Sequence, residues 1–327
     1  MKERQNYIDI AKGIGILVVI FSHSGGQHGL MTIIGGFFIP LFFVVSGYTL
    51  SMRDGQGYGA FMVKKAKRLL VPYVFFSIGL LLLYRCFLST DIIGAVYSRY
   101  CLYPFHEDNN VFFLRAGNAP LWFLTSMFVT YGAVWGLMKS GKYLPYVVII
   151  YLLLTYVLDF LPILLPWSLD TAFLMALFIY IGTWIKKMRI DNKIKSNVFI
   201  WVSLPIVYVL FCYLNGEPNL SVREYAHSFL LILVTGTIGS LIVIRLSQHL
   251  EHTCLCRVLS AFGRHSLVIF CIQMFLLHKQ NQLFFDILHM PLNTWTLYAS
   301  SILKTFLVAV IGVYASKGLK RILPNWF

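Results

Sequence analysis

Three ionisable residues stand within the first long apolar stretch of the chain. Asp9, Lys12 and His23 occur in the segment 8–24, which otherwise consists mainly of Ile, Val, Gly, Ala and Phe. A charged group in hydrocarbon costs on the order of 2.5–3.5 kcal/mol, so such groups persist where a partner, a cavity or a function compensates. At about 100° per residue, the three side chains fall within about 60° of one another on a helix. We therefore expect them to face the interior of a helical bundle.

The spacing of these residues limits the chemistry they can perform. Asp9 and Lys12 are three residues apart and can pair directly, whereas Lys12 and His23 lie about 16 Å apart along a helix axis. Asp9 and His23 therefore cannot form a carboxylate–histidine dyad within one helix. The pattern indicates a cationic site near one end and a titratable site near the other. A histidine pKa of about 6.5 suits a general base. Alternatively, His23 only marks the interfacial end of the helix.

The composition predicts that this helix lies in a membrane. Apolar residues make up 58% of the chain and charged residues 12%, against roughly 25% charged residues in soluble domains. Apolar stretches of about 20 residues, the length that crosses a hydrocarbon core of roughly 30 Å, recur throughout. We expect one all-α transmembrane domain over residues 1–327, with about ten membrane-spanning helices near 8–24, 31–51, 69–88, 121–138, 143–161, 168–185, 197–214, 226–244, 266–284 and 299–316.

The distribution of charge predicts the orientation of these helices. The net charge of +14 arises largely from Lys and Arg in the connections on one side of the spans, while most acidic residues fall on the other side. By the positive-inside rule the basic side, with both termini, is cytoplasmic. The basic connections are then expected near anionic lipid headgroups rather than on nucleic acid. Lys304 is an exception within the last span, and we expect its side chain to snorkel outward.

Two connections are long enough to do more than join helices. Segment 89–120, on the outer side, contains His106, Glu107 and Asp108 and either covers an outward-facing pocket or lies on the headgroups as a solvated loop. Segment 52–67, on the cytoplasmic side, changes from Gly-rich to basic. It could meet an anionic cofactor, although the orientation alone would also require its charges.

Other recognisable signals are weak. The opening segment is not read as a cleavable signal peptide, because Asp9 and Lys12 interrupt its apolar run and no small-x-small cleavage site follows. Cys254 and Cys256 flank a single residue, and no second ligand pair follows at the spacing of a zinc site. We therefore expect no metal.

Five segments of the chain carry a resemblance to one family. They are Arg4-x4-Asp9-x2-Lys12-x10-His23, PLFFVVSGY at 40–48, KAKRLLVP at 65–72, PLWFL at 120–124 and GRHSLVIFCIQ at 263–273. The first of them resembles the first helix of the acyltransferase 3 family, multispan enzymes that O-acetylate bacterial surface polysaccharides, and especially its short fucose 4-O-acetylase-like members. The later segments resemble, in the family's order, its PxFFxxSGY, Arg-x-x-x-Pro, LWFL and G-x-x-S-x-x-I-Y-x-x-H motifs.

The last motif departs from the family at its final position. Gln273 stands where the family has His, so we expect this position to act by hydrogen bonding rather than by proton transfer. His278 cannot substitute for the missing histidine, because it is rotated about 140° from Gln273 on a helix. The departure leaves the first-helix histidine in place.

The resemblance implies an integral membrane O-acyltransferase of the bacterial inner (plasma) membrane. It would transfer an acetyl group from cytoplasmic acetyl-CoA to a hydroxyl of a cell-envelope polysaccharide or a lipid-linked sugar. His23 would activate the acceptor hydroxyl or transiently carry the acyl group. The implied residues are Asp9, Lys12 and His23 for catalysis, Lys12, Ser46 and Arg68 for coenzyme binding, and Trp122 and Gln273 for glycan binding.

Each implied role has a structural alternative. Arg68 could be only a positive-inside charge, Trp122 could belong to an interfacial aromatic belt, and Ser46 could serve close helix packing while bonding a backbone carbonyl. The rival function is a secondary transporter in which the first-helix residues relay protons or bind an ion, which would predict inverted repeats and interrupted helices. A catalytically degenerate relative is a further alternative because of Gln273.

Overall fold

Helices form every regular element in the described part of the chain. The computed structural model describes residues 6–25, 29–52, 55–85, 88–104, 111–113, 119–190, 198–289 and 293–323, and within these ranges only two isolated β-bridges accompany the helices. The all-α prediction is thereby confirmed for these residues. Arg4 of the first-helix motif and His106, Glu107 and Asp108 of the outer connection lie outside the described residues.

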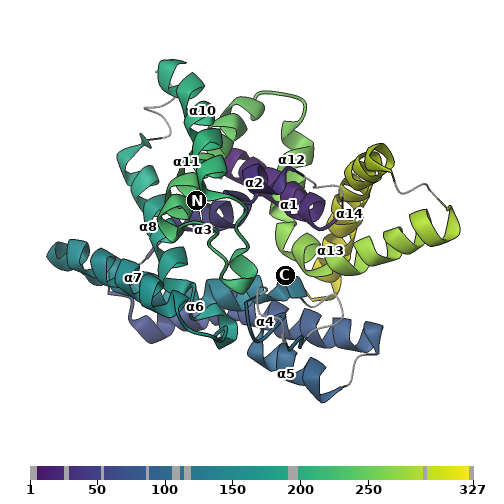
Figure 1. The fold of residues 1–327 in the computed structure, drawn as a ribbon, viewed down its shortest axis with the longest axis horizontal. Coiled ribbons are helices and arrows are strands. Elements are labelled where there is room, and N and C mark those ends of the chain that lie inside the picture. The colour runs from purple at the N-terminus through teal and green to yellow at the C-terminus, as the bar shows by residue number, and fades with distance from the viewer. Residues whose placement is uncertain are drawn as a thin grey trace.

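Figure 1 shows the arrangement of the helices. The long ones are α1 (Asn6–Ser22), α3 (Phe38–Tyr48), α4 (Tyr58–Tyr84), α5 (Ser89–Tyr97), α6 (Trp122–Lys139), α7 (Leu144–Asp159), α8 (Ala172–Met188), α10 (Val198–Asn215), α11 (Phe229–Leu250), α12 (Cys256–Arg264), α13 (Ser266–Asn281) and α14 (Thr294–Ile322). The short α2 (Met31–Ile34) precedes α3, and the π-helix η5 (Gln282–Ile287) continues α13.

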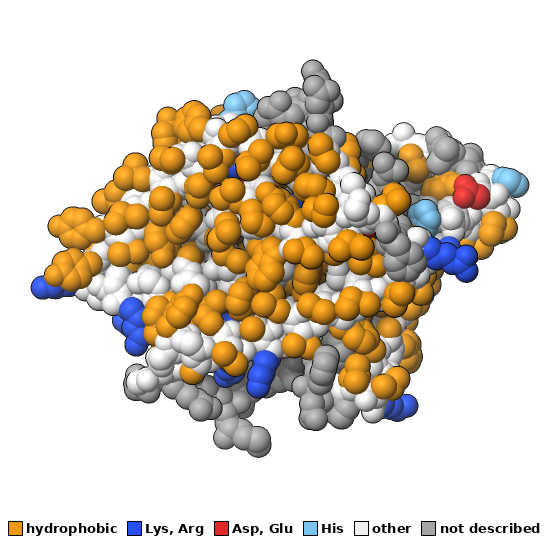
Figure 2. Space-filling view, turned by 90° about the horizontal axis from the view of Figure 1, so that it is seen from below, with side chains coloured by type: hydrophobic (Ala, Val, Ile, Leu, Met, Phe, Trp, Pro, Cys, Tyr) orange, Lys and Arg blue, Asp and Glu red, His pale blue; other side chains and the backbone are white. Residues whose placement is uncertain are grey.

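Several of these helices are long and apolar enough to cross a membrane. Six meet this condition, or seven if α12 and α13 with η5, which meet at an angle of 82°, count as one bent span. Helices α1, α6 and α10 also coincide with predicted spans but do not meet it, so the count of ten and the orientation of the termini stay predictions. Figure 2 shows a face covered by hydrophobic side chains with Lys and Arg mostly at its margins, as expected for a surface in contact with lipid.

Helix α1 lies in the middle of the bundle. It packs against α3, α11, α12, α13 and α14 (Figure 1). Its closest approach is to α12, where Gly13 faces the Leu259 carbonyl and Gly263 faces the Asp9 carbonyl. A Cβ atom on Gly263 would lie 1.7 Å from that oxygen. Two glycines therefore allow backbone contact at this crossing and fix the position of the first turns of α1.

A second glycine crossing joins α3 to α8. A Cβ atom on Gly47 would lie 1.8 Å from the Ile179 carbonyl oxygen, and one on Gly182 would lie 2.0 Å from that of Val44. The expectation that the Ser-Gly pair of the second motif, PLFFVVSGY at 40–48, permits close helix approach is confirmed for Gly47. Helices in lipid have no hydrophobic driving force for association, and small residues at such crossings allow the close backbone packing that stabilises it instead.

The basic segment that the sequence predicts on the cytoplasmic side is helical rather than a loop. The predicted connection 52–67 is wrong beyond its first residues, because α4 begins at Tyr58 and carries Lys64, Lys65 and Arg68 on its early turns. Phe61 explains the difference, since it is buried and its ring packs on those of Tyr131 and Trp135 of α6. The basic side chains are therefore held on a rigid element.

The described part of the outer connection is folded against the protein. Helix α5 and residues 98–101 pack on the segment that leads into α8, where Tyr97 donates to the Leu164 carbonyl at 2.8 Å and Trp167 donates to that of Val96 at 2.8 Å. Arg99 has 0% exposure. The alternative of a solvated loop is therefore wrong for residues 97–101, whereas α5 keeps apolar side chains such as Ile92, Ile93 and Val96 exposed.

Arg99 belongs to a buried cluster with Asp170 and Arg223, here called the outer arginine cluster. The two guanidinium groups bind opposite oxygens of Asp170, with Arg223 Nη1 3.2 Å from Oδ2. They also donate to backbone carbonyls of residues 161, 163, 165 and 221. Burial raises the pKa of the neighbouring Tyr225, which keeps its phenol neutral. The cluster ties three outer segments together.

Lys304 points into the bundle, so the prediction that it snorkels outward is wrong. Its side chain is 1% exposed, and its Nζ donates to the Ser24 carbonyl oxygen and to Asn281 Oδ1, each at 2.8 Å. The ammonium group also lies 5.2 Å from the centre of the Phe285 ring. These partners compensate for the loss of hydration that would otherwise drive the side chain to the interface.

Candidate active site

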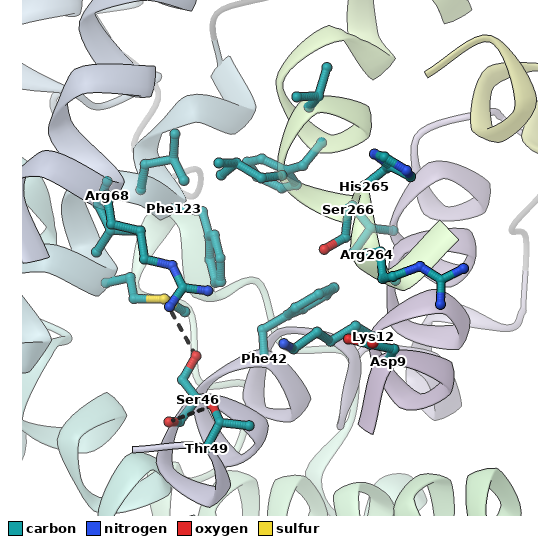
Figure 3. Close-up of a pocket in the computed structure, with 18 of the residues that line it drawn as sticks. Asp9, Lys12, Phe42, Ser46, Thr49, Arg68, Phe123, Arg264, His265 and Ser266 are labelled. Carbon is teal, nitrogen blue, oxygen red and sulfur yellow. Dashed lines mark hydrogen bonds between the residues drawn. The ribbon is translucent and has the colours of Figure 1, made fainter. Parts of the chain in front are cut away.

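A pocket of about 350 Å³ opens beside α1. Its walls come from α1, α3, α4, α6 and α14 and from the bend between α12 and α13 (Figure 3). The bend turns the start of α13 toward the pocket, so that His265 and Ser266 stand on its wall. The pocket thus forms where the chain's first, middle and last helices meet.

The pocket brings together four of the residues singled out from the sequence. Asp9, Lys12, Ser46 and Arg68 all line it, although they come from three helices. Figure 3 shows Lys12 beside Asp9 on one wall and Arg68 on the opposite wall, with the Lys12 and Arg68 head groups directed toward the space between them. Arg68 is exposed and Asp9 is buried. Arg68 therefore faces a cavity that it shares with Asp9 and Lys12.

Ser46 makes a different contact from the one expected. Its hydroxyl donates to the thioether sulfur of Met127 on α6 at 3.6 Å, and its backbone carbonyl accepts from the Thr49 hydroxyl at 3.3 Å (Figure 3). Hydrogen bonds from a hydroxyl group to a thioether sulfur are weak, because the thioether is a poor acceptor. The Ser46 hydroxyl can therefore be turned to a better acceptor in the pocket at little cost.

Positive charge predominates among the ionisable lining residues. The cations are Lys12, Lys65, Arg68, Arg264 and Lys320, and Asp9 is the one carboxylate among the described lining residues. Four cations in excess over acids attract a ligand with several negative charges, and Arg holds phosphate oxygens with two parallel hydrogen bonds. The part of the pocket that these cations line, here called the mouth, is suited to phosphate groups.

The inner part of the pocket is apolar and follows α1. Val19, Phe42, Leu124, Phe123 and Phe270 line it, and the Phe123 ring packs on Phe42 at 5.8 Å and on Phe270 at 5.3 Å between centroids. From Asp9 to Val19 the pocket extends about 15 Å along the helix axis. An apolar cavity of this length, here called the apolar channel, fits an extended chain better than a compact sugar.

His23 and Gln273 lie one helical turn beyond the inner end of this pocket. His23 follows Val19 by four residues and Gln273 follows Phe270 by three, which is about 4.5–6 Å along each axis, and neither residue lines the pocket itself. The His23 ring lies within interaction distance of the Gln273 amide and also engages the Val19 carbonyl. The two predicted residues therefore meet.

The surroundings of His23 and Gln273 differ. The His23 side chain is exposed although its neighbours Ser22 and Ser24 are buried, so it is open to an incoming molecule. Gln273 is 0% exposed, and neither of its amide atoms makes a hydrogen bond of standard geometry within the described part of the chain. Buried polar atoms are normally paired, so this amide has hydrogen-bonding capacity available for a ligand.

Trp122 does not line the pocket. It is 8% exposed and its ring stands edge-on to that of Phe123, which does line it. Its burial argues against the alternative of an aromatic belt facing lipid. A direct role in binding a glycan stays a prediction.

Sequence reasoning missed part of the cationic lining. The sequence predicts Lys65 in a connection that could meet an anionic cofactor; the residue lies on α4, where its Nζ stands 3.4 Å from the centroid of the Tyr131 ring and it lines the pocket. His265 was not singled out, yet its Nδ1 bonds the Ser316 hydroxyl at 2.8 Å and joins α13 to α14 on the pocket wall. The charges of Arg264 and Lys320 gave no signal beyond topology.

Within the described residues no group of three or more His, Cys, Asp or Glu is placed to hold a metal ion.

No curated protein and no solved structure gives a significant match to the chain. A family model described as an acyltransferase domain matches residues 5–314, nearly the whole chain. This match covers the five motifs apart from Arg4, and the helices that build the pocket apart from the last turns of α14. The chain is therefore a membrane acyltransferase that belongs to the acyltransferase 3 family.

Proposed function

We propose that this protein transfers an acetyl group from cytoplasmic acetyl-CoA to a hydroxyl group of a cell-envelope polysaccharide or lipid-linked sugar. In this proposal it spans a bacterial plasma membrane about ten times, with both termini in the cytoplasm. Donor and acceptor enter from opposite faces of the membrane. The cationic pocket mouth lies on the side that the charge distribution assigns to the cytoplasm.

One observation carries the proposal. The pocket joins a cationic mouth at Lys12 and Arg68 to an apolar channel that ends one turn short of His23. Coenzyme A has the matching order of groups, with phosphates at one end, a long flexible arm, and the thioester at the other. Its phosphates would bind at the mouth, supported by Lys65 and Lys320. The arm would then direct the thioester toward His23.

His23 is proposed as the general base. The His23 ring engages the Val19 carbonyl and lies beside the Gln273 amide; in the neutral ring one nitrogen donates and the other accepts a proton. It removes the proton from the acceptor hydroxyl as that oxygen forms a bond to the thioester carbonyl carbon. The carbon–sulfur bond then breaks, and His23 returns the proton to the departing thiolate. The products are an acetyl ester and free coenzyme A.

Other residues support this reaction. The Gln273 amide, buried and available for a ligand, would hold the acceptor hydroxyl or the thioester oxygen by hydrogen bonding. Ser46 would bind the coenzyme from the opposite wall. Asp9 would orient Lys12, its neighbour in the catalytic set, because the two side chains stand together on α1 (Figure 3). Trp122 would contribute to glycan binding from behind Phe123.

The transporter alternative has less support. It predicts interrupted helices in corresponding halves of the chain. Within the described residues one helix pair is sharply bent at a short break, α12 with α13, and it lies in the C-terminal half. The bend also contributes to the pocket, because it brings His265 and Ser266 to the pocket wall.

Mass spectrometry of envelope glycans tests the proposal. Cells that make wild-type protein, His23→Ala or no protein are compared, with His252→Ala as the control because His252 is an exposed histidine in the turn after α11. We expect acetylated glycan with wild type and with His252→Ala only. Loss of a general base lowers the rate about 10²- to 10⁴-fold.

Purified protein in lipid nanodiscs then gives the donor. Transfer from labelled acetyl-CoA to the glycan identified above is expected to require His23. Acetylation that persists with His23→Ala would reject the proposed base, and unchanged glycans in the presence of an abundant wild-type protein would reject the acetyltransferase function itself.

A further inference from the structure

Lys304 is a buried cation that the proposed reaction does not use. It lies on α14, which no catalytic assignment from the sequence includes, and it is 1% exposed. In the apolar core of a bundle an ammonium group needs partners, and Lys304 has three: the Ser24 carbonyl, the Asn281 amide oxygen and the face of the Phe285 ring. The positions of these partners indicate what the residue does.

The Ser24 carbonyl stands in the turn that follows α1, two residues beyond the last helical residue, Ser22. Lys304 Nζ donates to Ser24 O at 2.8 Å, and Ser301 Oγ donates to the same oxygen at 3.2 Å. The C-terminal end of a helix dipole favours a nearby cation. The chain turns immediately afterwards at Gly25, whose φ is +90°. Two side chains of α14 therefore hold the turn that contains His23.

Asn281 links the same ammonium group to the helix that carries Gln273. It is the last residue of α13, and its Oδ1 accepts from Lys304 Nζ at 2.8 Å. One cation thus holds the end of α1, next to His23, and the end of α13, two turns beyond Gln273. Because both links are short charge-assisted hydrogen bonds, they restrict the relative movement of the two helix ends.

From this geometry we infer that Lys304 is a positioning residue that sets the orientation of His23 relative to Gln273. It does not contact the reacting atoms, since its side chain is buried among Ser24, Asn281 and Phe285. It acts through the Ser24 peptide, which is adjacent to His23. The inference builds on the proposed function of His23 as the base, but the contact itself does not depend on the identity of the substrate.

The test compares three variants of purified protein in nanodiscs. Lys304→Met keeps the length of the side chain and removes the ammonium group, Ser301→Ala removes the second donor, and Lys317→Met is the control because Lys317 is exposed on the same helix. Two quantities are measured. They are the kinetic constants for acetyl-CoA and the rate at which diethyl pyrocarbonate modifies His23, followed by peptide mass spectrometry.

We expect Lys304→Met to lower kcat about 100-fold, because a displacement of about 1 Å at a catalytic group has this effect. The KM for acetyl-CoA should stay within about twofold, since the cationic mouth lies at the far end of α1. Ser301→Ala should lower kcat about 3- to 10-fold, the effect of one neutral hydrogen bond. The modification rate of His23 should change in both variants and not in Lys317→Met.

The outcomes separate this inference from the proposed function. An unchanged His23 modification rate in Lys304→Met overturns the inference whether or not the protein transfers acetyl groups. A kcat of Lys304→Met within about twofold of wild type also overturns it. So does an effect that appears in KM to the same extent as in kcat. If wild type is inactive with acetyl-CoA, the proposed function fails and the modification rate alone decides. If Lys304→Met does not accumulate, Ser301→Ala decides by the same two measurements.

Discussion

Cationic side chains cluster in two regions of this molecule, and the two regions differ in the burial of these side chains and in the acceptors around them. In the outer arginine cluster, Arg99 and Arg223 are 0% and 3% exposed, and Asp170 and backbone carbonyls accept their hydrogen bonds. In the pocket, five cations share the lining with one carboxylate, and Arg68 and Lys320 are exposed. The first arrangement uses the hydrogen-bonding capacity of its arginines internally. The second keeps positive charge available to a ligand.

The physical difference is whether the cationic side chains have hydrogen-bond acceptors and counter-ions within the protein. A buried guanidinium group without acceptors would be strongly destabilising, so each arginine of the outer cluster binds both a carboxylate oxygen and peptide oxygens. A binding site requires the reverse, since its charges must exchange water for substrate. Gln273 shows the same property without charge, as its buried amide has no partner of standard geometry within the described residues. Arg223 Nε is itself buried without a hydrogen-bond partner among the described residues, so the two regions differ chiefly in charge balance: Asp170 lies between the buried arginines, whereas cations outnumber acids in the described pocket lining.

The strongest test of this comparison is removal of the charge of Asp170. In Asp170→Asn, two buried guanidinium groups lose their common counter-ion, and we expect the free energy of unfolding to fall by about 3–5 kcal/mol. Thermal unfolding of the detergent-solubilised protein measures the change. Asp159→Asn is the matched control, because Asp159 lies 3.9 Å from Arg223 Nε but its side chain is 44% exposed, where an ion pair contributes little. Equal melting temperatures for the two variants would contradict the structural role of the cluster.

A smaller and opposite effect is expected at Gln273. Gln273→Leu replaces a buried amide that makes no hydrogen bond of standard geometry within the described residues, so the free energy of unfolding should rise by about 1–3 kcal/mol while acetyl transfer falls. Unfolding and transfer rates are measured on the same preparation. Gln248→Leu provides the comparison at a half-buried amide that accepts from Arg245 at 3.4 Å, where no gain in stability is expected. A Gln273→Leu protein that is both less stable and fully active would refute the distinction.

The smallest effect is expected at Arg68. Arg68→Gln should raise the KM for acetyl-CoA about tenfold, equivalent to about 1.4 kcal/mol, through loss of a charge-assisted contact with phosphate. Its melting temperature should not change, because the side chain is exposed. Lys64→Gln removes an exposed charge from the same helix away from the pocket lining and should leave KM unchanged. The KM of Arg68→Gln should also become less sensitive to salt. A fall in stability without a change in KM would place Arg68 with the structural arginines.

The first helix shows how far sequence reasoning reached. The periodicity of Asp9, Lys12 and His23 predicted a shared stripe, and Asp9 and Lys12 do line one pocket. Their separation from His23 is likewise retained, since His23 stands beyond the inner end of that pocket. These features depend on local helix geometry, which periodicity encodes.

The sequence alone determined the apolar helical character of the protein, the resemblance to its family and the stripe on α1, because each follows from composition or from spacing within one segment. Only the tertiary structure decided which partners the polar residues found. The side chain of Lys304 reaches Ser24, which is 280 residues away in the chain, and that of Lys65 stacks on a tyrosine of another helix. Whether a buried or interfacial cation points to solvent, to a carbonyl or to a ligand depends on acceptors supplied by other helices, and no pattern within its own helix contains that information.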